Sequence, residues 1–176
     1  MAITERGSEV SIRTGQIDDA ISILDIQRDV ITENKYLISE IGECNKTLEK
    51  QRIWIQKILD NNRETLIIAE KDEKVIGFIA FESPNRKRLA HTGSFETMIY
   101  SDYRGLGIGK MLISELLAWA ENNPLIEKVS LGVLSTNNRA ISLYKSMGFV
   151  EEGRKTKEIK VSENEYADDI LMYKFV

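Results

Sequence analysis

Residues 103–110 read Tyr-Arg-Gly-Leu-Gly-Ile-Gly-Lys, and they stand where a predicted strand passes into a helix. The three glycines let the backbone turn tightly with its amides facing inward. The first helical turn adds unpaired N–H groups and the positive end of the helix dipole. Such a junction can bind a diphosphate, and Arg104 and Lys110 add positive charge nearby. The same string also fits an ordinary glycine-rich turn before a helix.

Two better-known phosphate loops differ from this stretch. A Walker A loop has a Gly five positions before its Gly-Lys pair and a Ser or Thr after it, but here Arg104 and Met111 stand there. A dinucleotide fingerprint has its third Gly three residues after the second, whereas here the spacing is Gly-x-Gly-x-Gly. The sequence therefore argues against Mg-nucleotide hydrolysis and against dinucleotide binding.

Size, charge and composition narrow the class of protein. With 176 residues, 42% of them hydrophobic, we expect a single domain over residues 1–176. The net charge of −4 argues against a nucleic-acid partner, and no apolar run approaches the ~18 residues of a membrane span. Residues 1–10 lack a signal-peptide core, so we expect a cytoplasmic protein. One cysteine, Cys44, and one histidine, His91, predict neither an internal disulfide nor a usual zinc site, so we expect no metal.

The hydrophobic pattern predicts a mixture of strands and helices. Strands are expected at residues 10–13, 66–70, 75–81, 89–100, 128–134, 149–161 and 165–175. Helices are expected from about residue 17, after Thr47, from the glycine turn to Asn122, and from about residue 138 to Gly148. Tight polar links at residues 71–74 and 162–164 join two pairs of strands as hairpins. The first helix is expected to bury Ile17, Ile21 and Leu24.

Asn137 and Tyr144 form a second group of interest. They are seven residues apart, which is two helical turns, so both face the same way and can touch one ligand. Asn137 can instead serve only as the helix N-cap, and Tyr144 only as half-buried core. The order of elements favours the ligand-binding interpretation: a long strand, the glycine turn, a helix, a strand, this helix, and then Gly148-Phe149.

With both groups in place, the chain resembles the GNAT family of acetyl-CoA-dependent N-acetyltransferases. Residues 104–109 look like the family's Arg/Gln-x-x-Gly-x-Gly/Ala loop, and residues 137–149 look like its second coenzyme motif. The resemblance is clearest over about residues 97–150. It implies an α/β (α+β) fold with one central mixed, mainly antiparallel sheet of about seven strands, flanked by about four helices, whose middle strands splay apart. Many members carry Pro where this chain has Ser101. A Pro there would only stiffen the turn.

The resemblance also implies which residues bind acetyl-CoA. They are Met98, Ile99, Arg104, Gly105, Leu106, Gly107, Ile108, Gly109, Lys110, Asn137 and Tyr144. Backbone groups of Met98 and Ile99 would align the pantetheine arm and polarise the thioester carbonyl. Amides of residues 104–110 would hold the pyrophosphate. Tyr144 would donate a proton or a hydrogen bond to the leaving sulfur.

The acceptor side is less specific. Glu96 is the candidate base because it lies late in the strand beside the reaction centre, although it can also be a solvated strand residue. His91 has the better intrinsic pKa but lies further back. We expect the acceptor wall to come from residues 31–44 and the final hairpin. Possible contacts for a cation there, each of which can also be ordinary surface, are Glu33, Tyr36, Glu43 and Asp168.

The resemblance implies an enzyme that moves an acetyl group from acetyl-CoA directly to a primary amine. The acceptor can be a small amine, an amino acid or a protein N-terminus, and transfer of a longer acyl group is a variant. The alternative from another class is a non-catalytic coenzyme A-binding sensor or regulatory module of the same fold. Strand edges in the final hairpin would suit a homodimer.

Overall fold

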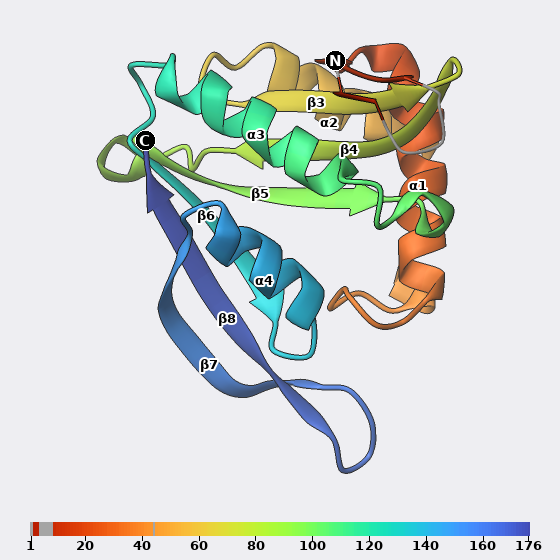
Figure 1. Ribbon diagram of the computed structural model, residues 1–176, viewed down its shortest axis with the longest axis vertical. Coiled ribbons are helices and arrows are strands. Elements are labelled where there is room, and N and C mark those ends of the chain that lie inside the picture. The colour runs from red at the N-terminus through yellow and green to blue at the C-terminus, as the bar shows by residue number, and fades with distance from the viewer. Residues whose placement is uncertain (1, 4–8, 44) are drawn as a thin grey trace.

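The computed structural model describes residues 2–3, 9–43 and 45–176, so Cys44 lies outside the described residues (Figure 1). The strands are β1 (Ala2–Ile3), β2 (Glu9–Thr14), β3 (Thr65–Lys71), β4 (Lys74–Glu82), β5 (Thr92–Ile99), β6 (Lys128–Leu134), β7 (Val150–Lys160) and β8 (Tyr166–Phe175). The α-helices are α1 (Ala20–Thr32), α2 (Leu48–Leu59), α3 (Ile108–Glu121) and α4 (Asn138–Ser146).

All eight strands form one sheet in the order β1-β2-β3-β4-β5-β6-β8-β7. Every neighbouring pair is antiparallel except β5 and β6, which run parallel. The predicted mixed, mainly antiparallel sheet with four helices is therefore confirmed. The two-residue strand β1 is an addition to the seven strands that the sequence predicts.

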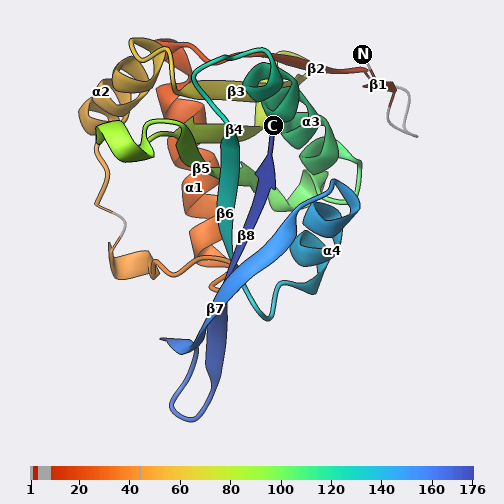
Figure 2. The ribbon, with the colours of Figure 1, turned by 90° about the vertical axis from the view of Figure 1, so that its left-hand side faces the viewer.

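The helices cover both faces of this sheet. Figure 2 shows α1 and α2 on one side of the strands and α3 and α4 on the other. Strand β4 illustrates why: Phe78 and Ala80 belong to the core under α1 and α2, whereas Ile79 and Phe81 belong to the core under α3. A strand buried on both faces reads as a continuous apolar run, as β4 does.

Strands β5 and β6 pair only at their beginnings. The register joins Thr92 to Lys128, Gly93 to Val129 and Ser94 to Ser130. Beyond Ser94 and Ser130 the two strands diverge, which Figure 1 shows as a V between β5 and β6. This confirms the predicted splay in the middle of the sheet, and it leaves backbone groups of both strands facing the opening.

Local sequence signals account for several element ends. Asp72 and Glu73 have φ of 50° and 61°, the left-handed geometry of a tight hairpin turn between β3 and β4. The Thr47 hydroxyl accepts a hydrogen bond from the Lys50 N–H and caps α2, as predicted. Gly148, with φ of 89°, follows the end of α4 as a left-handed residue.

Two expectations differ from the structure. Strand β5 begins at Thr92 rather than near residue 89, because Lys87–Leu89 forms a 3-10 helix. His91 consequently lies in the turn before the strand, where its carbonyl accepts hydrogen bonds from the Glu127 and Lys128 amides. The first helix also differs, because Ile17–Asp19 forms a 3-10 turn before α1. The tighter turn changes which side chains face the core, so Ile17 and Ile21 are exposed and not buried as predicted.

A half-buried ionic cluster joins β2 to the start of α1. The Arg13 guanidinium donates to both carboxylate oxygens of Asp19, at 2.8 and 2.9 Å, and to Glu70 at 2.8 Å. The Gln16 backbone N–H also donates to Asp19, at 2.7 Å. Burial alone would raise the pKa of Asp19, but these hydrogen bonds outweigh it and hold the pKa below its ordinary value.

Candidate active site

Two cavities meet at the splay between β5 and β6. The first, of about 360 Å³, lies between the end of β5, the glycine turn and α4. The second, of about 440 Å³, lies between β5, β6 and the segment that follows α1. The residues that line both cavities are Val30, Tyr36, Thr97, Met98, Asn137 and Tyr144. Ligands in the two cavities can therefore meet at the opening in the sheet.

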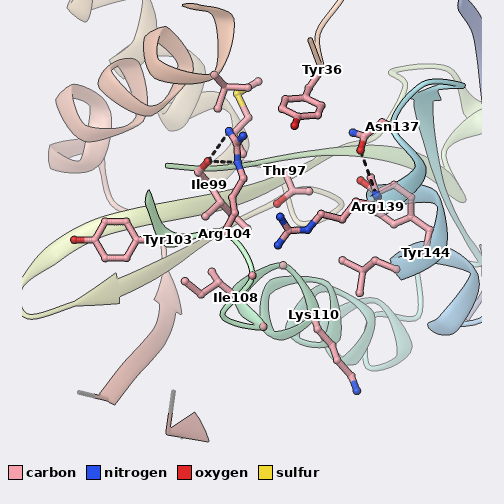
Figure 3. A pocket seen from close by; sticks show the side chains of 17 residues that line it. Tyr36, Thr97, Ile99, Tyr103, Arg104, Ile108, Lys110, Asn137, Arg139 and Tyr144 are labelled. Atoms are coloured by element: carbon pink, nitrogen blue, oxygen red, sulfur yellow. Dashed lines mark hydrogen bonds between the residues drawn. The ribbon is translucent and has the colours of Figure 1, made fainter. Parts of the chain in front are cut away.

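The glycine turn forms one wall of the first cavity (Figure 3). Gly105 and Gly107 have φ of 83° and 80°, which side chains other than glycine rarely adopt. Gly107 is the N-cap of α3 and provides no side chain for the first-turn amides. Gly109 allows close packing, because a Cβ there would lie 3.3 Å from the Leu143 side chain of α4. The turn thus presents bare amides and a helix N-terminus to the cavity.

The Arg104 side chain is bonded to other parts of the protein and is not a free positive charge. Its Nε and Nη2 donate to the Ile99 carbonyl at 3.2 and 3.1 Å, and its Nη1 donates to Glu33 at 2.7 Å. The guanidinium also stands 5.1 Å from the centroid of the Tyr36 ring. Burial lowers the pKa of Arg104, but the Glu33 carboxylate outweighs it and raises the pKa above its ordinary value. Arg104 therefore holds the glycine turn against the segment after α1.

The side chains of Lys110, Leu106 and Ile108 do not add a positively charged surface to the first cavity. Figure 3 shows the Lys110 side chain directed away from the cavity. Leu106 packs, partly buried, against the core under α3, and Ile108 is fully buried in that core. Any contribution of these three residues to a diphosphate site therefore comes from their backbone amides.

Arg139 is a candidate binding residue that the sequence reasoning missed. It lies in the first turn of α4, and its side chain points into the first cavity toward the glycine turn (Figure 3). Its Nη2 lies 3.3 Å from the position that a Cβ on Gly105 would occupy. The sequence does contain a signal for Arg139, since it is a basic residue two positions after Asn137. The fold places this helical turn opposite the glycines.

The backbone on the open edge of β5 belongs to Thr97 and Ile99. The Tyr100 N–H bonds the Ile76 carbonyl on β4, and the register then places Met98 opposite Phe78. Because backbone groups alternate along an antiparallel strand, those of Met98 point to β4, and those of Thr97 and Ile99 point to the opening. The Ile99 carbonyl is taken by Arg104, so its N–H and the Thr97 backbone remain. Met98 lines both cavities with its side chain.

Asn137 and Tyr144 face both cavities from α4, as their spacing predicts. The Asn137 side-chain oxygen accepts the Ala140 N–H at 3.2 Å, which confirms the N-cap interpretation and leaves its NH₂ group available to donate. The Tyr144 ring packs edge-on against Phe95 and Phe149. Burial raises the pKa of the Tyr144 hydroxyl to about 12, so it stays protonated across the neutral range.

Glu96 lines the second cavity from β5. It lies two residues before Met98 and therefore points to the face that α1 covers. Its side chain reaches solvent through the cavity, but the protein walls around it raise the pKa of the carboxyl above its ordinary value. The ammonium of Lys46 opposes this effect, and the Glu82 carboxylate adds to it. A carboxyl whose pKa is raised in this way gains its proton at a higher pH than a free carboxyl does.

Of the four residues predicted as possible contacts for a cation, two line the second cavity and two do not. Tyr36, Glu43 and other members of the segment after α1 line the second cavity. Glu33 is instead paired with Arg104. Asp168 bonds Arg154 and the Lys157 amide in the final hairpin, outside the cavity, and its neighbour Asp169 lines the cavity instead. Because successive strand residues face opposite sides, a shift of one position decides which carboxylate is inside.

Comparison with known proteins agrees with this geometry. Residues 32–149 match the family described as the acetyltransferase (GNAT) family. The chain is 28% identical to the SPbeta prophage-derived uncharacterized N-acetyltransferase YokL of Bacillus subtilis, over 97% of this chain and 92% of that protein. It is 26% identical to the L-amino acid N-acetyltransferase AaaT of Escherichia coli, over 68% and 74%. It is also 26% identical to the spermidine N(1)-acetyltransferase of Vibrio cholerae, over 71% and 70%.

A solved structure extends the similarity to the whole fold. The acetyltransferase of the GNAT family from Streptococcus pneumoniae superposes with a TM-score of 0.90 at 26% identity, covering 96% of this chain and 100% of that one. The chain therefore belongs to the GNAT family and is an acyltransferase that carries out acetyl-CoA-dependent acetylation. Among the described residues, no helix is long and apolar enough to cross a bilayer, and no group of three His, Cys, Asp or Glu is suited to hold a metal ion.

Proposed function

We propose that this enzyme transfers the acetyl group of acetyl-CoA directly to a primary amine, with the reaction centre at the opening between β5 and β6. The observation that carries the proposal is that two cavities converge there, with Tyr144 lining both. One cavity has the features of a coenzyme site and the other has carboxylates suited to an amine. None of the described residues that line both cavities is a cysteine or a serine, so direct transfer is favoured over an acyl-enzyme.

The first cavity would hold acetyl-CoA. The amides of residues 105–110 and the N-terminus of α3 would bind the pyrophosphate, whereas the Arg104 amide already donates to the Ser101 carbonyl. Arg139 would add a fixed positive charge. The Asn137 NH₂ group and the backbone of Thr97 and Ile99 would bind the pantetheine arm along the open edge of β5. This assignment moves the backbone role from Met98 to Thr97, and keeps Met98 as part of the wall.

The catalytic groups would act on opposite sides of the thioester. The amine nitrogen bonds the thioester carbonyl carbon, and the carbon–sulfur bond then breaks. N–H groups on the open edge of β5 would stabilise the negative charge that develops on the carbonyl oxygen. Glu96, directly or through water, would take the proton that the amine loses. The departing thiolate would receive a hydrogen bond from the Tyr144 hydroxyl.

The pKa of Tyr144 decides the form of that last step. At about 12 it is well above the ~8.5 of a thiol, so the hydroxyl is always protonated but holds its proton more tightly than the thiolate would. A hydrogen bond that strengthens as charge builds on sulfur is therefore favoured over complete proton transfer. The proton that finally resides on sulfur can come from solvent.

The alternative of a non-catalytic sensor finds no support, because the tyrosine and the glycines are in place and the matched relatives are named as N-acetyltransferases. The cytoplasmic location and the homodimer remain predictions. The test of the proposed function is product formation, followed by mass spectrometry, with acetyl-CoA and a panel of polyamines, monoamines, amino acids, aminoglycosides and peptides with free N-termini. We expect at least one class to be acetylated. Tight acetyl-CoA binding without product from any amine would contradict the proposal.

A further inference from the structure

The second cavity has an acidic lining. Three carboxylates line it, those of Glu43, Glu96 and Asp169, and Lys46 is the one cation among its described lining residues. The Lys46 ammonium stands 5.7 Å from the centroid of the Trp54 ring, a favourable position for a cation. The charge of this cavity therefore favours a cationic ligand and disfavours one that brings a carboxylate of its own.

Two of these carboxylates flank one strand on the same face of the sheet. Ser94 on β5 pairs with Ser130 on β6. Glu96 and Gly132 each lie two residues further along their strands, so they stand at the same level of the sheet. Both face the side that α1 covers. Asp169 approaches the same spot from β8, because its Oδ1 lies 3.1 Å from where a Cβ on Gly132 would stand. Gly132 thus leaves room for the Asp169 carboxylate beside β6, with Glu96 on the other side of that strand.

The Asp169 carboxylate keeps one oxygen for a ligand. Its Oδ2 lies 3.4 Å from the Nζ of Lys155, a half-exposed side chain of the final hairpin. Its Oδ1 is the atom that faces Gly132. The ion pair with Lys155 therefore leaves acceptor capacity on the cavity side of Asp169.

Gln27 supplies an independent sign of a ligand. Its side chain lies on α1, is only 2% exposed and lines the second cavity. Its Oε1 has no hydrogen-bond partner among the described residues. A buried amide oxygen of this kind is costly unless a donor reaches it. The cavity therefore offers a buried acceptor in addition to its carboxylates, and between them lie apolar walls that include Val30 and Leu134.

We propose that the acceptor is an aliphatic diamine or polyamine, whose reacting amine lies beside Glu96 and whose distal ammonium binds Asp169, with Gln27 accepting an N–H. This inference rests on the proposed function and names its substrate class. The alkyl spacer would lie on the apolar walls. In the reaction, the new nitrogen–carbon bond replaces the carbon–sulfur bond, one proton leaves the reacting amine, and the distal ammonium is unchanged. A free amino acid would place its own carboxylate among the three acidic groups, which would repel it.

Three small amines of matched length test the proposal. Putrescine has an ammonium at the far end, n-butylamine has a methyl group there, and γ-aminobutyrate has a carboxylate. We expect kcat/KM for putrescine to exceed that for n-butylamine by about tenfold or more, as one charge-assisted hydrogen bond allows, with γ-aminobutyrate the poorest. Equal values for putrescine and n-butylamine, or a better value for an amino acid or a peptide, would overturn the diamine class while leaving acetyl transfer standing.

Two variants locate the distal site. Asp169→Asn should raise KM for putrescine about tenfold and leave KM for n-butylamine within about twofold. Asp168→Asn is the matched control, since that carboxylate bonds Arg154 and Lys157 outside the cavity, and it should change neither value. Gln27→Leu should also raise KM for putrescine. Unchanged putrescine kinetics in both Asp169→Asn and Gln27→Leu would refute the site. No acetylation of any amine by the parent would refute the proposed function as well.

Discussion

Ser94 on β5 lies opposite Ser130 on β6, and this is the last residue pair that the two parallel strands share. The opening that begins there separates a side with bare amides and a helix N-terminus from a side with carboxylates. A thioester and an amine can therefore approach one another through the sheet without sharing a cavity. The divergence of two strands thus produces the opening at which the two cavities meet.

Gly107→Val should weaken acetyl-CoA binding about tenfold or more. A valine at φ of 80° is strained and would place a side chain among the amides that we propose bind the pyrophosphate. Gly153→Val is the control, since no atom lies within 4 Å of its Cβ position and its φ is not positive. Isothermal titration with acetyl-CoA measures both, and equal affinities for the two variants would remove the glycine turn from the coenzyme site.

Arg139→Met should also raise the dissociation constant for acetyl-CoA, by about tenfold, because a charge-assisted hydrogen bond to phosphate is lost. Lys110→Met removes the same charge from a side chain that points away from the cavity and should change the affinity by less than about twofold. The difference between the two should shrink as salt is added. Weaker binding in the Lys110 variant than in the Arg139 variant would contradict the assignment.

Glu96→Gln should lower kcat/KM and remove one limb of its pH profile. As the proposed base, Glu96 would act only when ionised, so activity should fall as the pH drops through the pKa of this carboxyl, which the protein walls around it raise above its ordinary value. The variant should keep only the pH dependence of the amine itself. If the acidic limb of the parent and of the variant coincide, Glu96 is not the base.

Asp19→Asn should lower the free energy of unfolding by about 2 kcal/mol, because Arg13 loses its charged partner in a half-buried cluster. The folded pKa of Asp19 is depressed, so its stabilisation is present above the unfolded pKa of ~3.9 and is lost as the pH falls through the folded value. Asp18→Asn, on the exposed neighbour, is the control. Urea unfolding at neutral pH and near pH ~3 should show the difference between parent and Asp19→Asn shrinking in acid.

Much of the fold follows from local patterns in the sequence. The apolar run of β4, the Thr47 cap and the polar link around Asp72 each carry a local signal, and the structure confirms the elements they predict. The glycine turn was visible for the same reason, because left-handed φ at Gly105 and Gly107 requires that residue type. Ile17 and Ile21 were misassigned because a 3-10 turn changed the helical phase, which apolar spacing alone does not reveal.

The details of the site depend on partners that are distant in the sequence. Whether Thr97 or Met98 faces the opening is decided by the pairing of β5 with β4. Arg104 is neutralised by Glu33, 71 positions earlier, and the inward carboxylate is Asp169 rather than Asp168 because of the strand register. The residue types near the motifs indicated a coenzyme site and an amine site. Only the tertiary contacts show which charged side chains are free and which are paired.

The most direct test of the account is the comparison of parent and Tyr144→Phe for acetyl-CoA affinity and for turnover with the best amine of the panel. We predict that the variant binds acetyl-CoA within about twofold of the parent and that its kcat falls about a hundredfold, because only the hydrogen bond to the leaving sulfur is lost. Equal kcat values in parent and variant would contradict the placement of the chemistry at the opening between β5 and β6.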